Sequence, residues 1–162
     1  MFELMTWLED SALADALRGL GVWSYGLINL VHIMGLSCLF GAIVILDLRL
    51  MQFSSHIAIK TVAGITVPIA KFGALLAIPS GFSMLTINTT QYYENPFLYL
   101  KLPLLVLALA NFLFISRIGA WRRAINDLVK RQGDSFFLAS AGFASLLLWT
   151  GVLACGRMIG YW

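Results

Sequence analysis

The chain has 162 residues, of which 60% are hydrophobic and only 12% are charged. Soluble domains average about half apolar and about a quarter charged residues, so this composition excludes an ordinary soluble protein. The net charge of +3 does not indicate nucleic acid as a partner, because the cations gather at the ends of apolar runs, where membrane topology explains them.

The N-terminal segment is too polar to cross a bilayer. Its leucines recur at helical spacing with acidic residues between them, at Leu4, Leu8, Leu13, Leu17 and Leu20. This pattern predicts an amphipathic helix over residues 2–19 that lies in the membrane surface. Gly19 and Gly21 would let the chain turn from this helix into the first span. The segment lacks the basic start of a signal peptide, so we expect it to remain in the mature protein.

Four apolar runs follow, each long enough to cross a hydrocarbon core of ~30 Å as a helix of about 20 residues. They cover residues 22–46, 62–87, 98–115 and 136–161. Together they predict a single all-α domain, an integral membrane four-helix bundle preceded by an interfacial helix. The two cysteines, Cys38 and Cys155, fall inside apolar runs, which favours free thiols over a disulfide.

Charges in the connecting loops predict the orientation of the spans. The loop after the third span is strongly basic, with the charged residues Arg117, Arg122, Arg123, Asp127, Lys130, Arg131 and Asp134. The loop after the first span holds Arg49 and Lys60 against Asp47, whereas the N-terminal segment is acidic. The positive-inside rule therefore puts both basic loops in the cytoplasm and both termini outside. On this topology Asp47 and Arg49 mark the point where the first span reaches the cytoplasmic interface.

His32 is the most informative residue for function. A polar ring at membrane depth costs free energy unless it is paired, so we expect it to face the interior of the bundle. It lies ten residues into the first span, about 15 Å along the helix and nearer the outer side. Tyr25, Asn29 and His32 are spaced four and three residues apart and share one helix face. These three residues form the candidate cofactor-binding stripe.

Three interpretations of His32 remain open. The first is a hydrogen-bonded structural histidine. The second is an axial ligand of a b-type haem, although His56, the other histidine, lies in a cytoplasmic loop where it could not complete a bis-imidazole site. The third is a Cu(I) site in which imidazole joins the soft ligands Met84, Cys155 and Met158, all of which approach the outer surface.

Lys71 is the other residue whose position in the membrane costs free energy, about ten residues into the second span. Its ammonium needs a carboxylate, carbonyls or water, or must extend to the cytoplasmic headgroups. Pro68 and Pro79 bracket it and free backbone carbonyls in the preceding turns. The alternatives are a kinked helix whose lysine reaches the headgroups, and a solute or proton path that uses Lys71.

Lys101 and Arg157 lie near the outer ends of the third and fourth spans. Each fits an interface anchor, and each could pair with an acidic residue or bind a lipid phosphate or a quinone headgroup. No nucleophile–base arrangement, zinc-protease motif, P-loop or dinucleotide fingerprint occurs in the sequence. We therefore do not expect an enzyme.

Three separated segments carry a family resemblance: HIMGLSCLFGAIVILDLRL, YYENPFLYLK and SLLLWTGVLACGRMIGYW. Together they resemble an uncharacterised family of small bacterial inner-membrane proteins with four predicted spans. More loosely, the histidine–glycine pattern of the first span is similar to the copper-resistance membrane protein family. The resemblance implies a multi-pass protein of the bacterial inner membrane, where the charge pattern puts both termini on the periplasmic side. It carries no assigned activity.

The family pattern singles out positions in three spans and one outer turn. They are His32, Gly35, Gly41, Asp47, Arg49, Asn95, Pro96, Lys101, Asn111, Gly156 and Arg157. The resemblance also implies a histidine after the position of Asn111, where this chain has NFLFISR and no histidine. That departure argues against a haem held by two histidines.

The resulting expectation is a non-catalytic integral membrane protein that serves as an accessory subunit of a larger respiratory or other redox complex. Its expected partners are the lipid bilayer and other membrane subunits or further copies of the chain, with quinone or lipid at the outer interface. One alternative is a haem b- or copper-binding protein centred on His32. The other is a small transporter or proton path that uses Lys71.

Overall fold

The computed structural model describes residues 2–87, 89–126, 128–129 and 132–162. All regular secondary structure in these ranges is helical. In chain order the elements are α1 (Phe2–Glu9), α2 (Ala12–Gly19), α3 (Val22–Leu50), α4 (Ile59–Ile87), η1 (Thr89–Tyr92), α5 (Pro96–Arg117), α6 (Gly119–Ile125), α7 (Asp134–Met158) and η2 (Ile159–Tyr161). Three charged loop residues used to predict orientation, Asp127, Lys130 and Arg131, lie outside the described residues, as does the side chain of Leu4.

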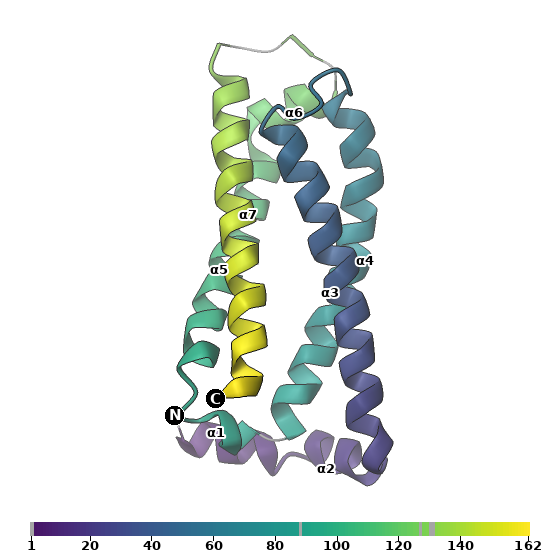
Figure 1. The fold of residues 1–162 in the computed structure, drawn as a ribbon, viewed down its shortest axis with the longest axis vertical. Helices are drawn as coiled ribbons and strands as arrows, with labels where there is room; N and C mark the ends of the chain where they lie inside the picture. Colours follow the sequence, from purple (N-terminus) through teal and green to yellow (C-terminus); the bar gives the residue numbers. More distant parts are fainter. Residues whose placement is uncertain (1, 88, 127, 130–131) are drawn as a thin grey trace.

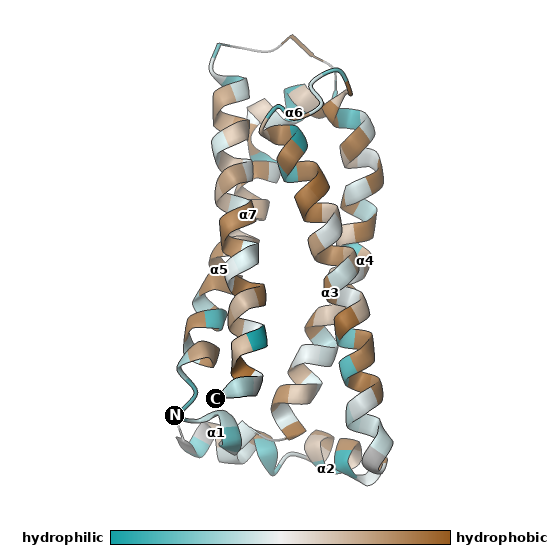
Figure 2. Cartoon of the chain, viewed as in Figure 1, coloured by the Kyte–Doolittle hydropathy of each residue, from teal (hydrophilic) through white to brown (hydrophobic). Residues whose placement is uncertain are grey.

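Four helices, α3, α4, α5 and α7, are long and apolar enough to cross a membrane. The predicted all-α fold with four spans is therefore confirmed. Figure 2 shows hydrophobic residues along all four helices and hydrophilic residues mainly at the two ends. The bounds differ from the predicted spans: α3 continues through Asp47 and Arg49 to Leu50, and α7 ends at Met158, where η2 follows.

The four long helices run side by side, and the short helices close the two ends of the bundle (Figure 1). α3 packs along α4, α5 packs along α7, and a contact between α3 and α7 joins the two pairs. α1 and α2 lie across one end, which also holds both termini, and α6 lies at the other. We call these the α1/α2 end and the α6 end.

The N-terminal segment forms two helices where the sequence pattern predicted one over residues 2–19. The break falls at Ser11, whose Oγ accepts a hydrogen bond from the Ala14 N–H at 3.3 Å and so caps the start of α2. Both helices lie across the bundle end, as expected of an interfacial segment (Figure 1). Serine favours such caps over helix interiors, which explains the break.

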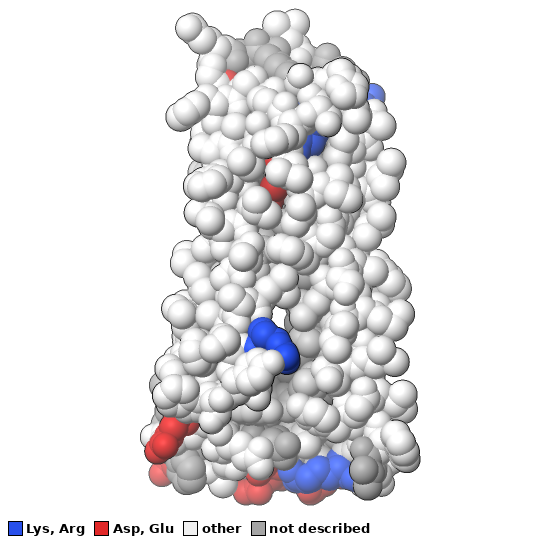
Figure 3. Space-filling model, viewed as in Figure 1, with Lys and Arg blue, Asp and Glu red and all other residues white. Residues whose placement is uncertain are grey.

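Polar contacts attach α1 and α2 to the end of α4. A Glu9 carboxylate oxygen accepts the Thr90 N–H at 2.6 Å. The Arg18 guanidinium donates to the carbonyls of Ile87 at 3.2 Å and Glu9 at 2.8 Å and pairs with Asp15 at 2.7 Å. The hydrogen bond from the Thr90 backbone lowers the pKa of Glu9, with a smaller contribution from the charge of Arg18. Figure 3 shows acidic and basic groups gathered at this end of the molecule.

Small residues let the backbones of α3 and α4 touch. A Cβ atom on Gly35 would lie 2.6 Å from the Ala77 nitrogen and 2.9 Å from the Gly73 carbonyl oxygen. A Cβ on Gly73 would in turn meet the backbone of Leu39 and the Gly35 carbonyl oxygen at 2.7 Å. In lipid, such close approach is a main source of helix association, because burial from water contributes little.

Two asparagines hold α5 against the last helix. The Asn95 side chain accepts the Phe97 N–H at 3.0 Å, which caps α5, and donates to the Ile159 carbonyl at 3.1 Å. Asn111 donates to the Ala141 carbonyl at 3.3 Å from the middle of α5. The side chains thus bond carbonyls of α7 and η2 across the helix pair.

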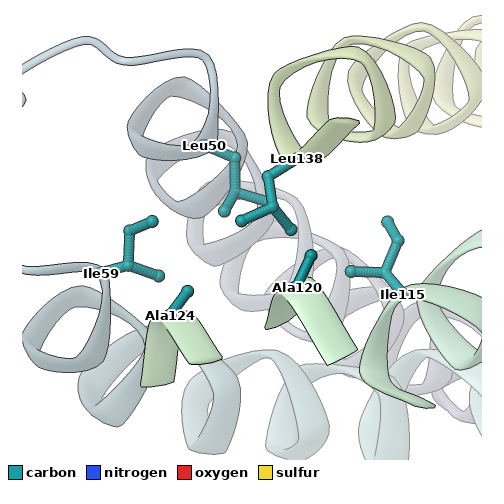
Figure 4. Packing of buried hydrophobic residues seen from close by; sticks show 6 residues of the cluster. All are labelled: Leu50, Ile59, Ile115, Ala120, Ala124 and Leu138. Atoms are coloured by element: carbon teal, nitrogen blue, oxygen red, sulfur yellow. The ribbon is translucent and has the colours of Figure 1, made fainter. Parts of the chain in front are cut away.

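The α6 end is closed by an apolar cluster (Figure 4). Its residues are Leu50, Ile59, Ile115, Ala120, Ala124 and Leu138. Ala120 and Ala124 bring α6 close to the ends of the long helices, and Asp134 at the start of α7 binds Arg123 of α6 through two hydrogen bonds of 2.7 and 2.6 Å. A second cluster, around Leu39, Ala108 and Trp149, joins the helix pairs.

Replacing Gly35 by alanine should weaken the α3–α4 contact. The added methyl group meets backbone atoms that cannot move aside, so we expect a loss of about 1–3 kcal/mol in the free energy of unfolding. Gly26→Ala is the matched control on the same helix, because nothing lies within 4 Å of its Cβ position. Unfolding in mixed micelles, followed by circular dichroism, measures both variants, and equal stability would contradict the backbone contact.

The attachment of α1 should depend on pH through Glu9. Because the folded state lowers the pKa of Glu9 from 4.5, its contribution is complete above pH 4.5 and is lost as the pH falls through the lowered value. The protection factor of the Thr90 amide against hydrogen exchange should therefore fall in acid. Glu9→Ala, which removes the acceptor, should show low protection at every pH, whereas Glu3→Ala should behave like the wild type. A Glu9→Ala protein with wild-type protection would show that this hydrogen bond does not hold the segment.

Candidate functional site

His32 lies between α3 and α4, half-buried, in the half of the bundle next to the α1/α2 end. Its Nδ1 is 2.8 Å from the Ala77 carbonyl oxygen and 3.1 Å from the Ser80 Oγ. The carbonyl can only accept, and the Ser80 hydroxyl donates to the Leu76 carbonyl at 2.5 Å. Nδ1 must therefore carry the proton and donate. The expected inward-facing, hydrogen-bonded histidine is what the structure contains.

The second ring nitrogen of His32, Nε2, has no hydrogen-bond partner among the described residues. With the proton on Nδ1, Nε2 carries the lone pair of a neutral imidazole. The ring lies over Gly81, where a Cβ atom would come within 2.8 Å of Cε1. Gly81 thus provides the space for the ring, and α4 fixes both its tautomer and its rotation.

The other helix pair carries two cations in the half of the bundle next to the α1/α2 end. The Lys101 amine, half-buried on α5, lies 3.2 Å from the Cβ position of Gly156, so the glycine makes room for it. Arg157, on α7, stacks over the Tyr161 ring at 4.5 Å and also donates to the Tyr161 hydroxyl. Within the described ranges no carboxylate pairs with either cation.

The other members of the predicted polar stripe behave differently from His32. Tyr25 is hydrogen-bonded to Tyr92 of η1, and burial together with this bond raises the pKa of Tyr92 to about 12. Asn29 is half-buried and makes no hydrogen bond to a described residue. Tyr25 thus binds η1, and His32 alone of the three bonds α4.

The proposed copper ligands, with His32 on α3, are spread over three helices. Cys155 is buried on α7, Met84 is half-buried on α4, and Met158 is exposed at the end of α7. The described contacts of the His32 ring involve none of these three side chains. In the part of the chain that the structure describes, no group of three His, Cys, Asp or Glu residues could hold a metal ion. Copper binding stays a prediction from sequence.

Asp47 and Arg49 are buried within the protein, 5% and 6% exposed, near the end of α3, and their place at the cytoplasmic interface stays a prediction. Asp47 is hydrogen-bonded to Ser145 of α7, and its Oδ2 has no partner among the described residues. Arg49 donates to the carbonyls of Ile57 at 2.5 Å and Ser55 at 3.1 Å. α7 and the loop after α3 cover these two side chains. Asp47 connects α3 to α7 through Ser145, and Arg49 holds the loop through its two backbone carbonyls.

Lys71 lies on the exposed side of α4 and does not line the interior of the bundle. α4 continues as one helix through both Pro68 and Pro79, so the helix is not broken there. Asp47, the acid that could have paired with Lys71, binds Ser145. The geometry therefore does not place Lys71 on a path between the helices.

Several site residues were not identified from the sequence. The Ala77 carbonyl is a backbone group and has no sequence signal. Ser80 and Gly81 follow a proline inside a span, and a serine–glycine pair at the depth of a histidine could have indicated a partner. Ser145 resembles any small polar residue of a membrane helix, so nothing in the sequence pairs it with Asp47.

Arg49→Lys should loosen the loop over residues 51–58. Lysine keeps the charge but has one donor group in place of the two guanidinium nitrogens that bind Ser55 and Ile57, so we expect a loss of about 1.5–3 kcal/mol in the free energy of unfolding. Faster proteolysis of the loop should accompany it. Arg122→Lys, at an exposed position, is the control. A loop as resistant as that of the wild type would contradict the role given to Arg49.

Comparison with known proteins supports one part of the predicted resemblance, the membership of an uncharacterised family. A family model described as a family of unknown function (DUF6644) matches residues 4–162. No curated protein and no solved structure matches the chain. The family match covers most of α1, every later helix and every site residue described above. The chain therefore belongs to DUF6644, a family of unknown function.

Proposed function

We propose that the protein is a b-type haem-binding subunit of a membrane redox assembly, with His32 as an axial ligand. The observation that carries this proposal is the hydrogen bond from His32 Nδ1 to the Ala77 carbonyl. Histidine ligands of metals are commonly held in this way, with one nitrogen donating to a backbone carbonyl and the other left for the metal.

The chemistry of the surrounding groups fits haem b. Haem b is a flat apolar ring with two carboxylates. A haem site therefore needs an imidazole for the iron, apolar side chains for the ring and cations for the carboxylates. Lys101 and Arg157 supply cations that lack a carboxylate partner in the described ranges, on the helix pair opposite His32. Figure 3 shows a narrow hollow on the face of the bundle beside a basic group that lies well away from both ends.

Each residue of the site has a defined task in this proposal. The Ala77 carbonyl and Ser80 keep the His32 ring in one tautomer and one orientation, and Lys101 offers its amine to a carboxylate. Bound haem would supply one-electron redox chemistry. His56 is exposed in the loop between α3 and α4, at the opposite end from His32. The second axial ligand is thus not an imidazole from the same chain.

The assembly part of the proposal follows from the location of the site. The described chain consists of membrane helices and short helices at their ends, so electrons would have to pass to or from another protein. With the basic loops in the cytoplasm, the α1/α2 end faces the outside of a bacterial inner membrane. His32 then lies in the outer half of the bilayer, and exchange with a partner would take place near that surface.

An absorption spectrum of protein purified from haem-supplemented cells tests the proposal. We expect a Soret band in the wild type, its loss in His32→Ala and its retention in the matched control His56→Ala. Ser80→Ala should weaken haem binding about 10–100-fold, because it removes a contact that orients the ligand. Absence of a Soret band in the wild type would overturn the proposal, and copper found by elemental analysis in that protein would favour the copper alternative.

A further inference from the structure

One side of α4 carries exposed residues spaced by three or four positions along the whole helix. They are Gly64, Pro68, Lys71, Leu75, Ile78 and Phe82, and we call them the Lys71 face. The opposite side of α4 packs on α3. Apolar side chains exposed to lipid need no explanation, but a lysine among them does.

Lys71 lies too deep to reach the headgroups easily. It is the thirteenth of the 29 residues of α4, about 18 Å from Ile59 and about 24 Å from Ile87. A helix of this length, about 43 Å, overshoots a core of ~30 Å by about 6 Å at each end when centred. Lys71 then starts about 12 Å inside the nearer edge, roughly twice the reach of its four-carbon side chain.

The same face presents backbone carbonyls that lack their usual donors. Pro68 and Pro79 have no N–H, so the carbonyls of Gly64 and Leu75 cannot receive the ordinary bond from four residues ahead. Gly64 and Leu75 both belong to the Lys71 face. Proline is tolerated in membrane helices where neighbouring groups satisfy the freed carbonyls. A cation and two freed carbonyls on one face indicate that protein covers it.

A second copy of the chain does not supply the missing charge. The acids in the described membrane helices are Asp47, which is buried against Ser145, and Asp134, which binds Arg123 at the α6 end. A symmetric dimer through this face would also bring one Lys71 toward the other, and like charges repel. The complementary group must come from a different protein.

We propose that the Lys71 face binds the membrane helix of another protein, which presents a carboxylate to Lys71 and polar donors to the freed carbonyls. The inference deepens the assembly role in the proposed function and rests on that role, but it does not depend on haem. The partner is defined by its chemistry: a spanning segment with Asp or Glu at the depth of Lys71.

Site-specific photo-crosslinking in native membranes tests this interface. A photoreactive residue replaces Leu75, which is 69% exposed one turn from Lys71, and the control probe replaces Leu147 of α7, which is 58% exposed. We expect one discrete adduct with a different protein from the Leu75 probe and none from the Leu147 probe. Mass spectrometry of the adduct should identify a partner helix that carries a carboxylate.

Charge variants separate a specific ion pair from chance proximity. The adduct should persist in Lys71→Arg, fall about tenfold in Lys71→Met, the size of a strong polar contact between membrane helices, and disappear in Lys71→Glu. Reversing the partner carboxylate to lysine should restore the adduct with Lys71→Glu. Circular dichroism should show wild-type folding in all variants, because Lys71 has no hydrogen bond to the described residues.

Three results would overturn the inference: adducts only between copies of the chain, adducts only with lipid, or a partner adduct unchanged in Lys71→Met. The haem spectrum of Lys71→Met should equal that of the wild type, since Lys71 lies on the side of α4 away from His32. A missing Soret band with an intact adduct would therefore refute the haem proposal alone, and the converse result would refute the interface alone.

Discussion

The backbone contact between α3 and α4 determines the geometry of the rest of the molecule. Gly35 and Gly73 bring the two helices together, and the groups of the candidate site lie within about one turn of them: His32 before Gly35, and Ala77 after Gly73. At ordinary helix separation the His32 ring would not reach a carbonyl of α4. The same contact is needed for association, because in lipid close packing replaces the hydrophobic effect as the main attraction between helices.

The two ends of the bundle have different interactions. Contacts between the helix pairs join them at the α6 end, and the polar groups of the candidate site lie toward the α1/α2 end. At the α6 end, α3 meets α7 where Asp47 binds Ser145 and where a Cβ on Gly142 would lie 3.1 Å from the Asp47 carbonyl oxygen. Toward the α1/α2 end, His32 bonds α4 within one pair, and Lys101 lies against Gly156 within the other. The Asp47 contact therefore joins the pairs at the α6 end, and the groups that could bind a ligand lie toward the α1/α2 end.

Hydropathy alone predicted the fold, because a span of about 20 apolar residues has few alternatives to a membrane helix. It also predicted that His32 faces inward, since a polar ring in lipid needs a partner. It could not identify that partner, because a backbone carbonyl such as that of Ala77 has no sequence signature. It gave no sign that Asp47 and Arg49 are buried, because charged residues at the end of a span usually meet water, and only the fold shows that α7 and the following loop cover them.

The distribution of charge connects the interior of the bundle to its surface. Lys101 is half-buried on α5, Arg157 and Lys71 are exposed on α7 and α4, and Asp47 and Asp134 are the acids buried in the described membrane helices, where Asp134 pairs with Arg123. Asp47 binds Ser145 and neutralises none of these cations. The negative charges that would balance them must then come from outside the chain. In the two proposals these negative charges are the haem carboxylates and a carboxylate of the partner helix on the Lys71 face. Haem and the partner helix would therefore both recognise the excess of positive charge in the membrane helices.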